Sequence, residues 1–270
     1  MRYTIYMNNK PIGIFDSGLG GLTILRALQN DLPKENFIYF GDSARVPYGS
    51  KSKSTVLQYS LEIAKFLETQ NIKFLVVACN TASAFALEAL KKELSIPVFG
   101  VIEAGAYAAV TKTKNKKVAV IGTSGTVSSG SYKKVINAFD KKVKVFEIAT
   151  PLFVPFIEEG WADTRAAKLV AEEYLSAVKK SGSDTLILGC THYPIIKTLI
   201  KKIMGSKVNL IDSAETISKA TAGFLKSKDM LKTKGSGSVK IYASDAPDLF
   251  AKKAGAILKS KIKKVYLHKF

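Results

Sequence analysis

The strongest constraint on the fold is a regular alternation of short apolar runs with longer amphipathic segments. The apolar runs at Pro11–Asp16, Phe37–Asp42 and Lys73–Cys79 are strand-sized and carry too few polar residues for a strand with one face in water. Between these runs, apolar residues recur at helical spacing, as in the segment whose N-cap we expect at Ser54. Alternation of this kind predicts βαβ units, parallel sheets and helices on both faces.

The same pattern then starts again in the second half of the chain. IFDSG, which ends at Gly18, aligns with IGTSG, which ends at Gly125, and each precedes a cysteine-ending apolar run by nearly the same number of residues. We therefore predict an α/β fold of two related, doubly wound domains, with a ligand cleft between the carboxyl ends of their strands. The segment IPVFGVI is expected to be a short strand that ends at Glu103.

Composition indicates a globular chain with no membrane span. The 270 residues suffice for two domains, and 47% of them are apolar, which is enough to build cores. The longest apolar runs are too short to cross a bilayer, and the N-terminal residues lack the apolar stretch of a secretory signal. We expect a cytoplasmic protein, in which a reducing environment keeps its two cysteines as thiols.

The formal net charge of +19, from 41 basic and 22 acidic residues, raises the question of nucleic-acid binding. However, the lysines occur as short pairs spread along the chain, and no basic region is interleaved with aromatic residues. We therefore interpret the charge as solvated helix faces and do not expect a nucleic-acid partner. The positive field could still attract an anionic substrate.

The two cysteines are the strongest candidates for chemistry. Cys79 ends FLVVAC and Cys190 ends TLILGC, and small polar residues follow each of them. Backbone N–H groups at such a strand end can stabilise a thiolate. Either thiol taken alone also fits a packing role, since free cysteine is often a small buried hydrophobe. Together, two such thiols could reach one bound molecule from opposite sides.

Three neighbouring features could complete a site. His192 follows Cys190 closely and could hydrogen-bond to its thiol or protonate it, although a structural histidine is the competing interpretation. The loop DSGLGG (Asp16 to Gly21) matches neither the dinucleotide nor the P-loop pattern, but its N–H groups could bind a carboxylate. The loop at Gly41 to Ser52 offers the ring of Tyr48 beside a flexible glycine.

Taken together, these motifs make the chain similar to the bacterial glutamate racemases of the cofactor-independent aspartate/glutamate racemase superfamily. DSGLGG, PYGSKS, ACNTAS, VIGTSGT, VPFIEEG and GCTHYP occur in the order typical of that family. The resemblance implies two flavodoxin-like domains related by a pseudo-twofold axis, an active site between them and a homodimer. It also implies a first domain of residues 1–105 completed by 218–270, and a second domain of residues 106–217.

The resemblance also assigns roles to individual residues. It implies that Cys79 and Cys190 are the two acid/base residues, that Asp16 assists the first, and that Glu158 and His192 assist the second. No metal or other cofactor is implied. The positions that match the family's substrate-binding residues are Asp16, Ser17, Tyr48, Gly49, Asn80, Thr81, Thr123, Thr126, Thr191 and His192.

The expected reaction is the interconversion of L- and D-glutamate, which supplies D-glutamate for peptidoglycan. One cysteine, as thiolate, removes the α-proton, and the other, as thiol, donates a proton to the opposite face. A racemase or isomerase acting on another amino acid, such as aspartate, is the close alternative. Two alternatives of other classes are a nucleic-acid- or partner-binding protein that uses the basic surface and a thiol redox protein. The redox alternative is disfavoured because the cysteines are not in CxxC spacing.

Overall fold

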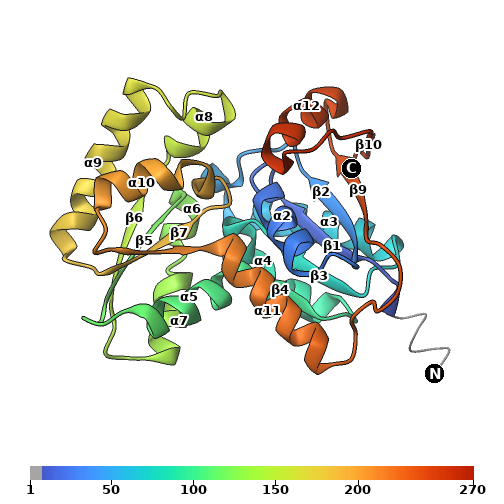
Figure 1. Ribbon diagram of the computed structural model, residues 1–270, viewed down its shortest axis with the longest axis horizontal. Helices are drawn as coiled ribbons and strands as arrows, with labels where there is room; N and C mark the ends of the chain where they lie inside the picture. Colours follow the sequence, from blue (N-terminus) through green and yellow to red (C-terminus); the bar gives the residue numbers. More distant parts are fainter. Residues whose placement is uncertain (1–7) are drawn as a thin grey trace.

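Two parallel sheets lie side by side, each covered by helices, in the computed structural model, which describes residues 8–270 (Figure 1). Residues 1–7, which the predicted first domain includes, lie outside the described residues. The N-terminal part of the chain and its C-terminal end form one side of the molecule, and the middle of the chain forms the other (Figure 1).

The larger sheet has six strands in the order β10-β9-β2-β1-β3-β4, all parallel. Strands β9 and β10 come from the C-terminal end and extend the sheet beyond β2. The strand bounds are β1 (Ile12–Asp16), β2 (Asn36–Gly41), β3 (Phe74–Val77), β4 (Val98–Gly100), β9 (Ser238–Ala243) and β10 (Val265–Leu267).

The smaller sheet repeats the central order of the larger one. Its four parallel strands are arranged as β6-β5-β7-β8, which matches β2-β1-β3-β4 position by position. The prediction of an α/β fold with two parallel sheets is therefore confirmed. The bounds are β5 (Lys117–Gly122), β6 (Lys144–Ala149), β7 (Thr185–Gly189) and β8 (Asn209–Asp212).

Helices connect the parallel strands and cover both sheets, as crossover connections require (Figure 1). Two short 3₁₀ turns, η1 (Tyr48–Ser50) and η2 (Tyr193–Ile196), follow β2 and β7. The α-helices are α2 (Leu22–Asp31), α3 (Lys53–Thr69), α4 (Asn80–Glu93), α5 (Val101–Lys112), α6 (Ser124–Ser128), α7 (Ser131–Phe139), α8 (Phe153–Glu158), α9 (Arg165–Ser181), α10 (Lys197–Met204), α11 (Ser213–Ser227) and α12 (Pro247–Leu258).

Helix α5 is the main departure from the predicted elements. The expected strand up to Glu103 is wrong, because β4 ends at Gly100 and α5 starts at the next residue. The apolar residues Val101 and Ile102 are buried as the first turn of a helix, where a short apolar run looks the same as a strand. The domain boundaries remain a prediction; those after residues 105 and 217 fall within α5 and α11.

The central strands of both sheets are buried on both faces. Every residue of β1 and of β7 is buried, which explains why their sequences are nearly continuous apolar runs. Each sheet has apolar clusters on its two sides, formed with the helices that cover it. The strand ends are therefore held rigidly, and the polar residues that follow them are fixed in place.

The expected N-cap of α3 is wrong by two residues. The side chain of Ser52, not Ser54, accepts a hydrogen bond from the Thr55 N–H, at 3.2 Å. Both serines precede or begin the same apolar pattern, so periodicity alone does not distinguish them.

We expect Ser52→Ala to lower the free energy of unfolding by about 1 kcal/mol, because it removes this cap. Ser54→Ala is the matched control, since Ser54 is exposed in the first turn and caps nothing. It should change the free energy by about 0.5 kcal/mol or less. Denaturant unfolding of both variants measures the difference, and equal effects would contradict the assignment of the cap.

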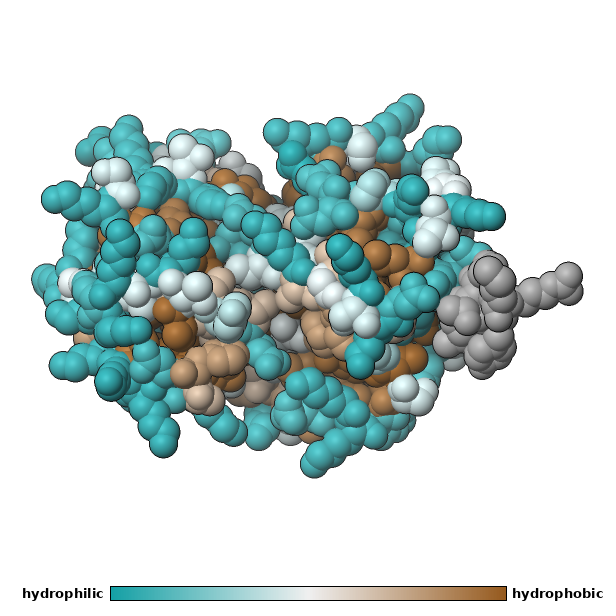
Figure 2. All heavy atoms as spheres, turned by 60° about the horizontal axis from the view of Figure 1, so that its bottom comes forward, coloured by the Kyte–Doolittle hydropathy of each residue, from teal (hydrophilic) through white to brown (hydrophobic). Residues whose placement is uncertain are grey.

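The face of the molecule in Figure 2 is largely hydrophilic over both halves. In Figure 2, hydrophilic side chains are spread across both halves of the visible face, with apolar side chains between them. Within residues 8–270, no helix is both long enough and apolar enough to cross a membrane.

Candidate active site

A small cavity lies where the carboxyl ends of the two sheets meet. In each sheet the strand order reverses between the first strand and the cysteine-bearing strand, and such a switch point is where ligands of open α/β sheets bind. The cavity volume is about 20 Å³, which has room for about one water molecule. It is lined by Ser17, Pro47, Tyr48, Gly49, Cys79, Asn80, Thr81, Thr123, Val154, Cys190, Thr191 and His192.

Most of the residues expected at the site line this cavity, and both cysteines are among them. Asp16, Glu158 and Thr126 lie behind it, and each is hydrogen-bonded to a residue that does line it. Two lining residues, Pro47 and Val154, were not singled out, although the motifs PYGSKS and VPFIEEG contain them. Nothing in those motifs distinguishes an apolar wall residue from an ordinary core residue.

The surroundings of Cys79 favour its thiol form over the thiolate. It is the N-cap of α4, and its sulfur accepts a hydrogen bond from the Ala82 N–H at 3.5 Å. Burial and the nearby Asp16 carboxylate raise the pKa of the Cys79 thiol to about 12, and this outweighs the lowering by the Ala82 N–H. The expected N–H contact is present at Cys79, but the dry site and the negative neighbour oppose the thiolate that this contact favours.

Cys190 has a basic partner instead. His192 Nδ1 lies 3.7 Å from its sulfur, and His192 Nε2 lies 2.6 Å from Glu158 Oε1. Burial alone would lower the pKa of His192, but the hydrogen bonds to Cys190 and Glu158 raise it to about 10. Burial likewise opposes ionisation of Glu158, yet the bond to His192 keeps the pKa of that carboxyl below its usual range. A cysteine beside an imidazole that a carboxylate orients is the arrangement of an activated nucleophile or base, and the raised pKa of His192 places a positive charge next to Cys190.

Asp16 connects the two halves of the site. The residue is fully buried at the end of β1, where its Oδ2 accepts from the Gly18 N–H at 3.1 Å. Its Oδ1 accepts from Thr191 Oγ1 at 3.2 Å, across to the residue that follows Cys190. Burial raises the pKa of Asp16 although His192 and the backbone N–H groups act in the opposite direction. Asp16 therefore aligns Thr191 and adds negative charge beside Cys79.

Hydroxyl and amide groups form the opposite wall of the cavity. Thr81 Oγ1 lies 2.9 Å from Thr123 Oγ1 and 3.2 Å from Thr126 Oγ1, so these hydroxyls come from both halves of the chain. Asn80 accepts a 2.8 Å hydrogen bond from the Tyr132 hydroxyl through Oδ1, which fixes the orientation of its amide. The buried Nδ2 of Asn80 then has no partner among the described residues. An N–H donor that lines the cavity is thus available to a ligand.

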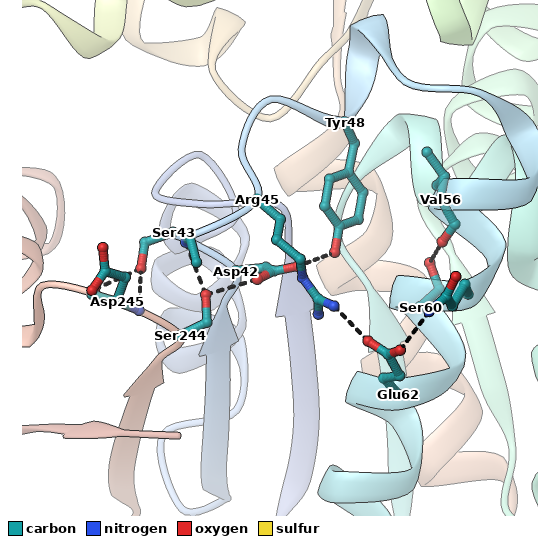
Figure 3. A network of polar contacts seen from close by, with 11 residues as sticks. Asp42, Ser43, Arg45, Tyr48, Val56, Ser60, Glu62, Ser244 and Asp245 are labelled. Atoms are coloured by element: carbon teal, nitrogen blue, oxygen red, sulfur yellow. Dashed lines mark hydrogen bonds and ion pairs between the residues drawn. The ribbon is translucent and has the colours of Figure 1, made fainter. Parts of the chain in front are cut away.

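The loop that carries Tyr48 and Gly49 is anchored from behind. The Tyr48 hydroxyl donates to Asp42, which also accepts from Arg45 Nε and from the Ser244 hydroxyl, each at 2.7 Å (Figure 3). The Tyr48 hydroxyl therefore points away from the cavity and is not available to a ligand. Of the groups of Tyr48, only the ring and the backbone can therefore contact a ligand. Asp42 is a site-supporting residue that the sequence analysis placed only at a strand end.

Two glycines allow the halves of the site to approach closely. A Cβ atom at Gly20 would overlap Thr191 Oγ1 and lie 2.6 Å from His192 Nδ1. A Cβ atom at Gly49 would overlap the Thr123 side chain, at 2.7 Å from its Cγ2. Each glycine lies in a loop that follows a strand of the larger sheet. It contacts residues that follow strands of the smaller sheet, at a distance that leaves no room for a side chain. The sequence analysis assigned Gly49 to the substrate and missed Gly20.

Charge in the cavity comes from few groups. Among the described residues that line it there is no lysine or arginine, so positive charge there comes from His192. Within residues 8–270, no group of three or more His, Cys, Asp or Glu side chains is arranged to hold a metal ion. An anionic ligand would therefore be held by N–H groups, hydroxyls and the imidazolium.

Comparisons of the sequence and of the structure with known proteins both find glutamate racemases. The chain is 51% identical over 258 residues to the glutamate racemase of Geobacter metallireducens, covering 95% of this chain and 96% of that protein. It superposes on a crystal structure of a glutamate racemase isoform from Bacillus anthracis with a TM-score of 0.95 at 38% identity, covering 97% and 98% of the two chains. The glutamate racemase of Francisella tularensis in complex with D-glutamate gives a TM-score of 0.91 at 39% identity, with the same coverage.

The family model described as Asp/Glu/Hydantoin racemase matches residues 22–221. This range begins with α2, the helix after the glycine loop, and ends within α11. It includes both cysteines, His192 and Glu158. From this match and the near full-length relatives, we conclude that the chain belongs to the Asp/Glu/hydantoin racemase family.

Proposed function

We propose that this protein is a glutamate racemase that interconverts L- and D-glutamate with two cysteine bases. The observation that carries the proposal is that Cys79 and Cys190, which follow equivalent strands of the two sheets, line one cavity. The relatives at 38% to 51% identity are glutamate racemases, and one of them is described in complex with D-glutamate. We propose the same substrate for this chain.

The two cysteines take different roles in each direction of the reaction. Cys190, in contact with the His192 imidazolium, reacts as the thiolate and removes the α-proton of the substrate to form an S–H bond. The electron pair of the broken C–H bond moves into the α-carboxylate. The Cys79 thiol then donates its proton to the opposite face of the α-carbon and becomes the thiolate. Reaction of the other enantiomer uses the same steps in reverse.

The transient carbanion requires positioned donors, because an α-C–H bond is a weak acid. We assign this role to the unpartnered Asn80 Nδ2 and to the hydroxyls of Ser17 and Thr81, which belong to residues that line the cavity. The N-terminal N–H groups of α4 lie on the same side as Asn80 and favour negative charge. A cavity of about 20 Å³ must widen to admit glutamate, and its closing around the bound substrate excludes water and strengthens each of these interactions.

Turnover with single enantiomers tests the function. Circular dichroism should show the signals of L-glutamate and of D-glutamate each decaying to zero, because the equilibrium mixture is racemic. The same assay with L- and D-aspartate and alanine measures specificity. No decay with glutamate would contradict the proposed function, and faster decay with aspartate would contradict the proposed substrate.

We also propose that the protein supplies D-glutamate for peptidoglycan in the cytoplasm and works as a homodimer. The family relationship supports both proposals. Exposed large apolar side chains also support a protein interface, since Tyr107 on α5 is 62% exposed and packs against Phe139 of α7. Light scattering during size-exclusion chromatography measures the mass in solution, and the mass of a single 29.3 kDa chain would contradict the dimer.

A further inference from the structure

Lys253 reaches from one side of the molecule to the other behind the candidate active site. It lies on α12, which packs beside the larger sheet, while Glu158 is the last residue of α8 beside the smaller sheet (Figure 1). Lys253 Nζ donates to the backbone oxygen of Glu158 at 3.0 Å and lies 4.0 Å from its Oε2. Both residues line an outer pocket of about 420 Å³. Glu158 thus stands between this pocket and His192.

We propose that Lys253 is a positioning residue, which holds Glu158 where its carboxylate accepts the hydrogen bond of His192. The proposal rests on the proposed racemase function, because it concerns the Cys190 half of that site. Lys253 itself touches neither cysteine nor any residue of the inner cavity in the contacts that it makes through Nζ. Its effect reaches Cys190 through Glu158 and then through His192.

The local geometry explains why Glu158 needs such a contact. Helix α8 has six residues, and a helix this short depends on tertiary contacts for its position. Lys253 satisfies a carbonyl at the C-terminal end of that helix, where a positive charge is favourable. The same ammonium group faces the carboxylate oxygen that His192 does not use. One lysine therefore fixes both the backbone and the side chain of Glu158.

The charges around Glu158 are mixed, which gives Lys253 a specific electrostatic role. His192 and Lys253 are the positive groups near it, while Glu159 and Asp245 line the same outer pocket and carry negative charge. The buried Tyr39 phenol also lies close enough to interact with Glu158. Lys253 helps His192 to keep the pKa of Glu158 below its usual range, against the effect of burial. Removing Lys253 therefore weakens the positive field that keeps the Glu158 carboxyl ionised.

Lys253→Met tests the proposal, with Lys253→Arg as the conservative variant and Lys252→Met as the matched control. Lys252 is the adjacent residue on α12 and is exposed. We expect Lys253→Met to lower kcat/KM about fivefold, since it removes a charge-assisted hydrogen bond and a partly exposed ion pair. The loss must be equal in both directions, because the equilibrium constant between enantiomers is one. Arginine should restore most of the rate, and Lys252→Met should match the wild type.

The pH profile separates positioning from a structural role. Without Lys253 the pKa of Glu158 rises, so the acidic limb of kcat/KM should move to higher pH in Lys253→Met and return in Lys253→Arg. The proposal would be overturned if Lys253→Met left kcat/KM and the acidic limb of its pH profile unchanged. A loss of kcat/KM that Lys253→Arg does not reverse would overturn it as well. A wild-type enzyme that does not racemise glutamate would instead overturn the proposed function, so the two failures are distinguishable.

Discussion

Replacing either Cys79 or Cys190 with alanine is expected to lower racemisation by about 10³-fold or more in both directions. Each variant lacks one of the two groups that must act on opposite faces of the α-carbon, and no other thiol is present in the sequence. Removing one buried sulfur atom leaves only a small cavity, so both variants should stay folded, with a loss of about 1 kcal/mol. Circular dichroism measures turnover, and thermal unfolding checks the fold.

Proton exchange in D₂O separates the two roles more sharply than turnover does. A variant with one cysteine can still remove the α-proton that faces the remaining sulfur and return a deuteron to the same face. Cys79→Ala should therefore exchange one enantiomer of glutamate without racemising it, and Cys190→Ala should exchange the other. NMR of the α-proton, with each enantiomer supplied separately, records this.

The two exchange rates should also differ. Burial and Asp16 hold the pKa of Cys79 at about 12, so little thiolate forms there, whereas Cys190 has the positively charged His192 beside it. Exchange should therefore be slower in Cys190→Ala, where Cys79 is the remaining base. The two-base assignment fails if both variants exchange the same enantiomer, or if either one keeps near wild-type racemisation.

The fold was largely predictable because the sequence contains the same pattern twice. Buried parallel strands read as continuous apolar runs, and IFDSG and IGTSG mark equivalent strand ends, β1 and β5, in the two sheets. The failures occurred where the local pattern is ambiguous. Val101 and Ile102 continue the apolar run of β4, yet they begin α5, and only packing against neighbouring helices settles that choice.

The sequence predicted which residues lie together at the site, but it did not predict their pKa values. Motif register placed Cys190, His192 and Glu158 together, and the structure joins them by direct contacts. The raised pKa of Cys79 could not be predicted from ACNTAS, because it depends on burial in the folded chain and on Asp16, which approaches from a different strand. Lys253 could not be identified from the sequence either. Nothing distinguishes it among the 41 basic residues of the chain until the structure shows its contact with Glu158.

Gly20→Ala is expected to lower kcat/KM by about 10²-fold although it removes no functional group. The new methyl group would overlap Thr191 Oγ1 and lie 2.6 Å from His192 Nδ1, so one of these side chains must move. Either movement acts on the Cys190 half, through the Thr191–Asp16 bond or through the His192–Cys190 contact. A displacement of about 1 Å in such a group costs a factor of this size.

Gly223→Ala is the matched control for this substitution. Gly223 lies on α11, and a Cβ atom there would meet nothing within 4 Å, so alanine should keep full activity and stabilise the helix by about 0.5–1 kcal/mol. If Gly20→Ala keeps full activity while folded, Thr191 and His192 do not need their present positions. The hydrogen-bonded chain behind Cys190 would then be a packing feature, and the assignment of His192 and Glu158 as helpers would lose its basis. A loss of activity in Gly20→Ala alone, with an unchanged melting temperature, ties catalysis to the close approach of the two halves of the site.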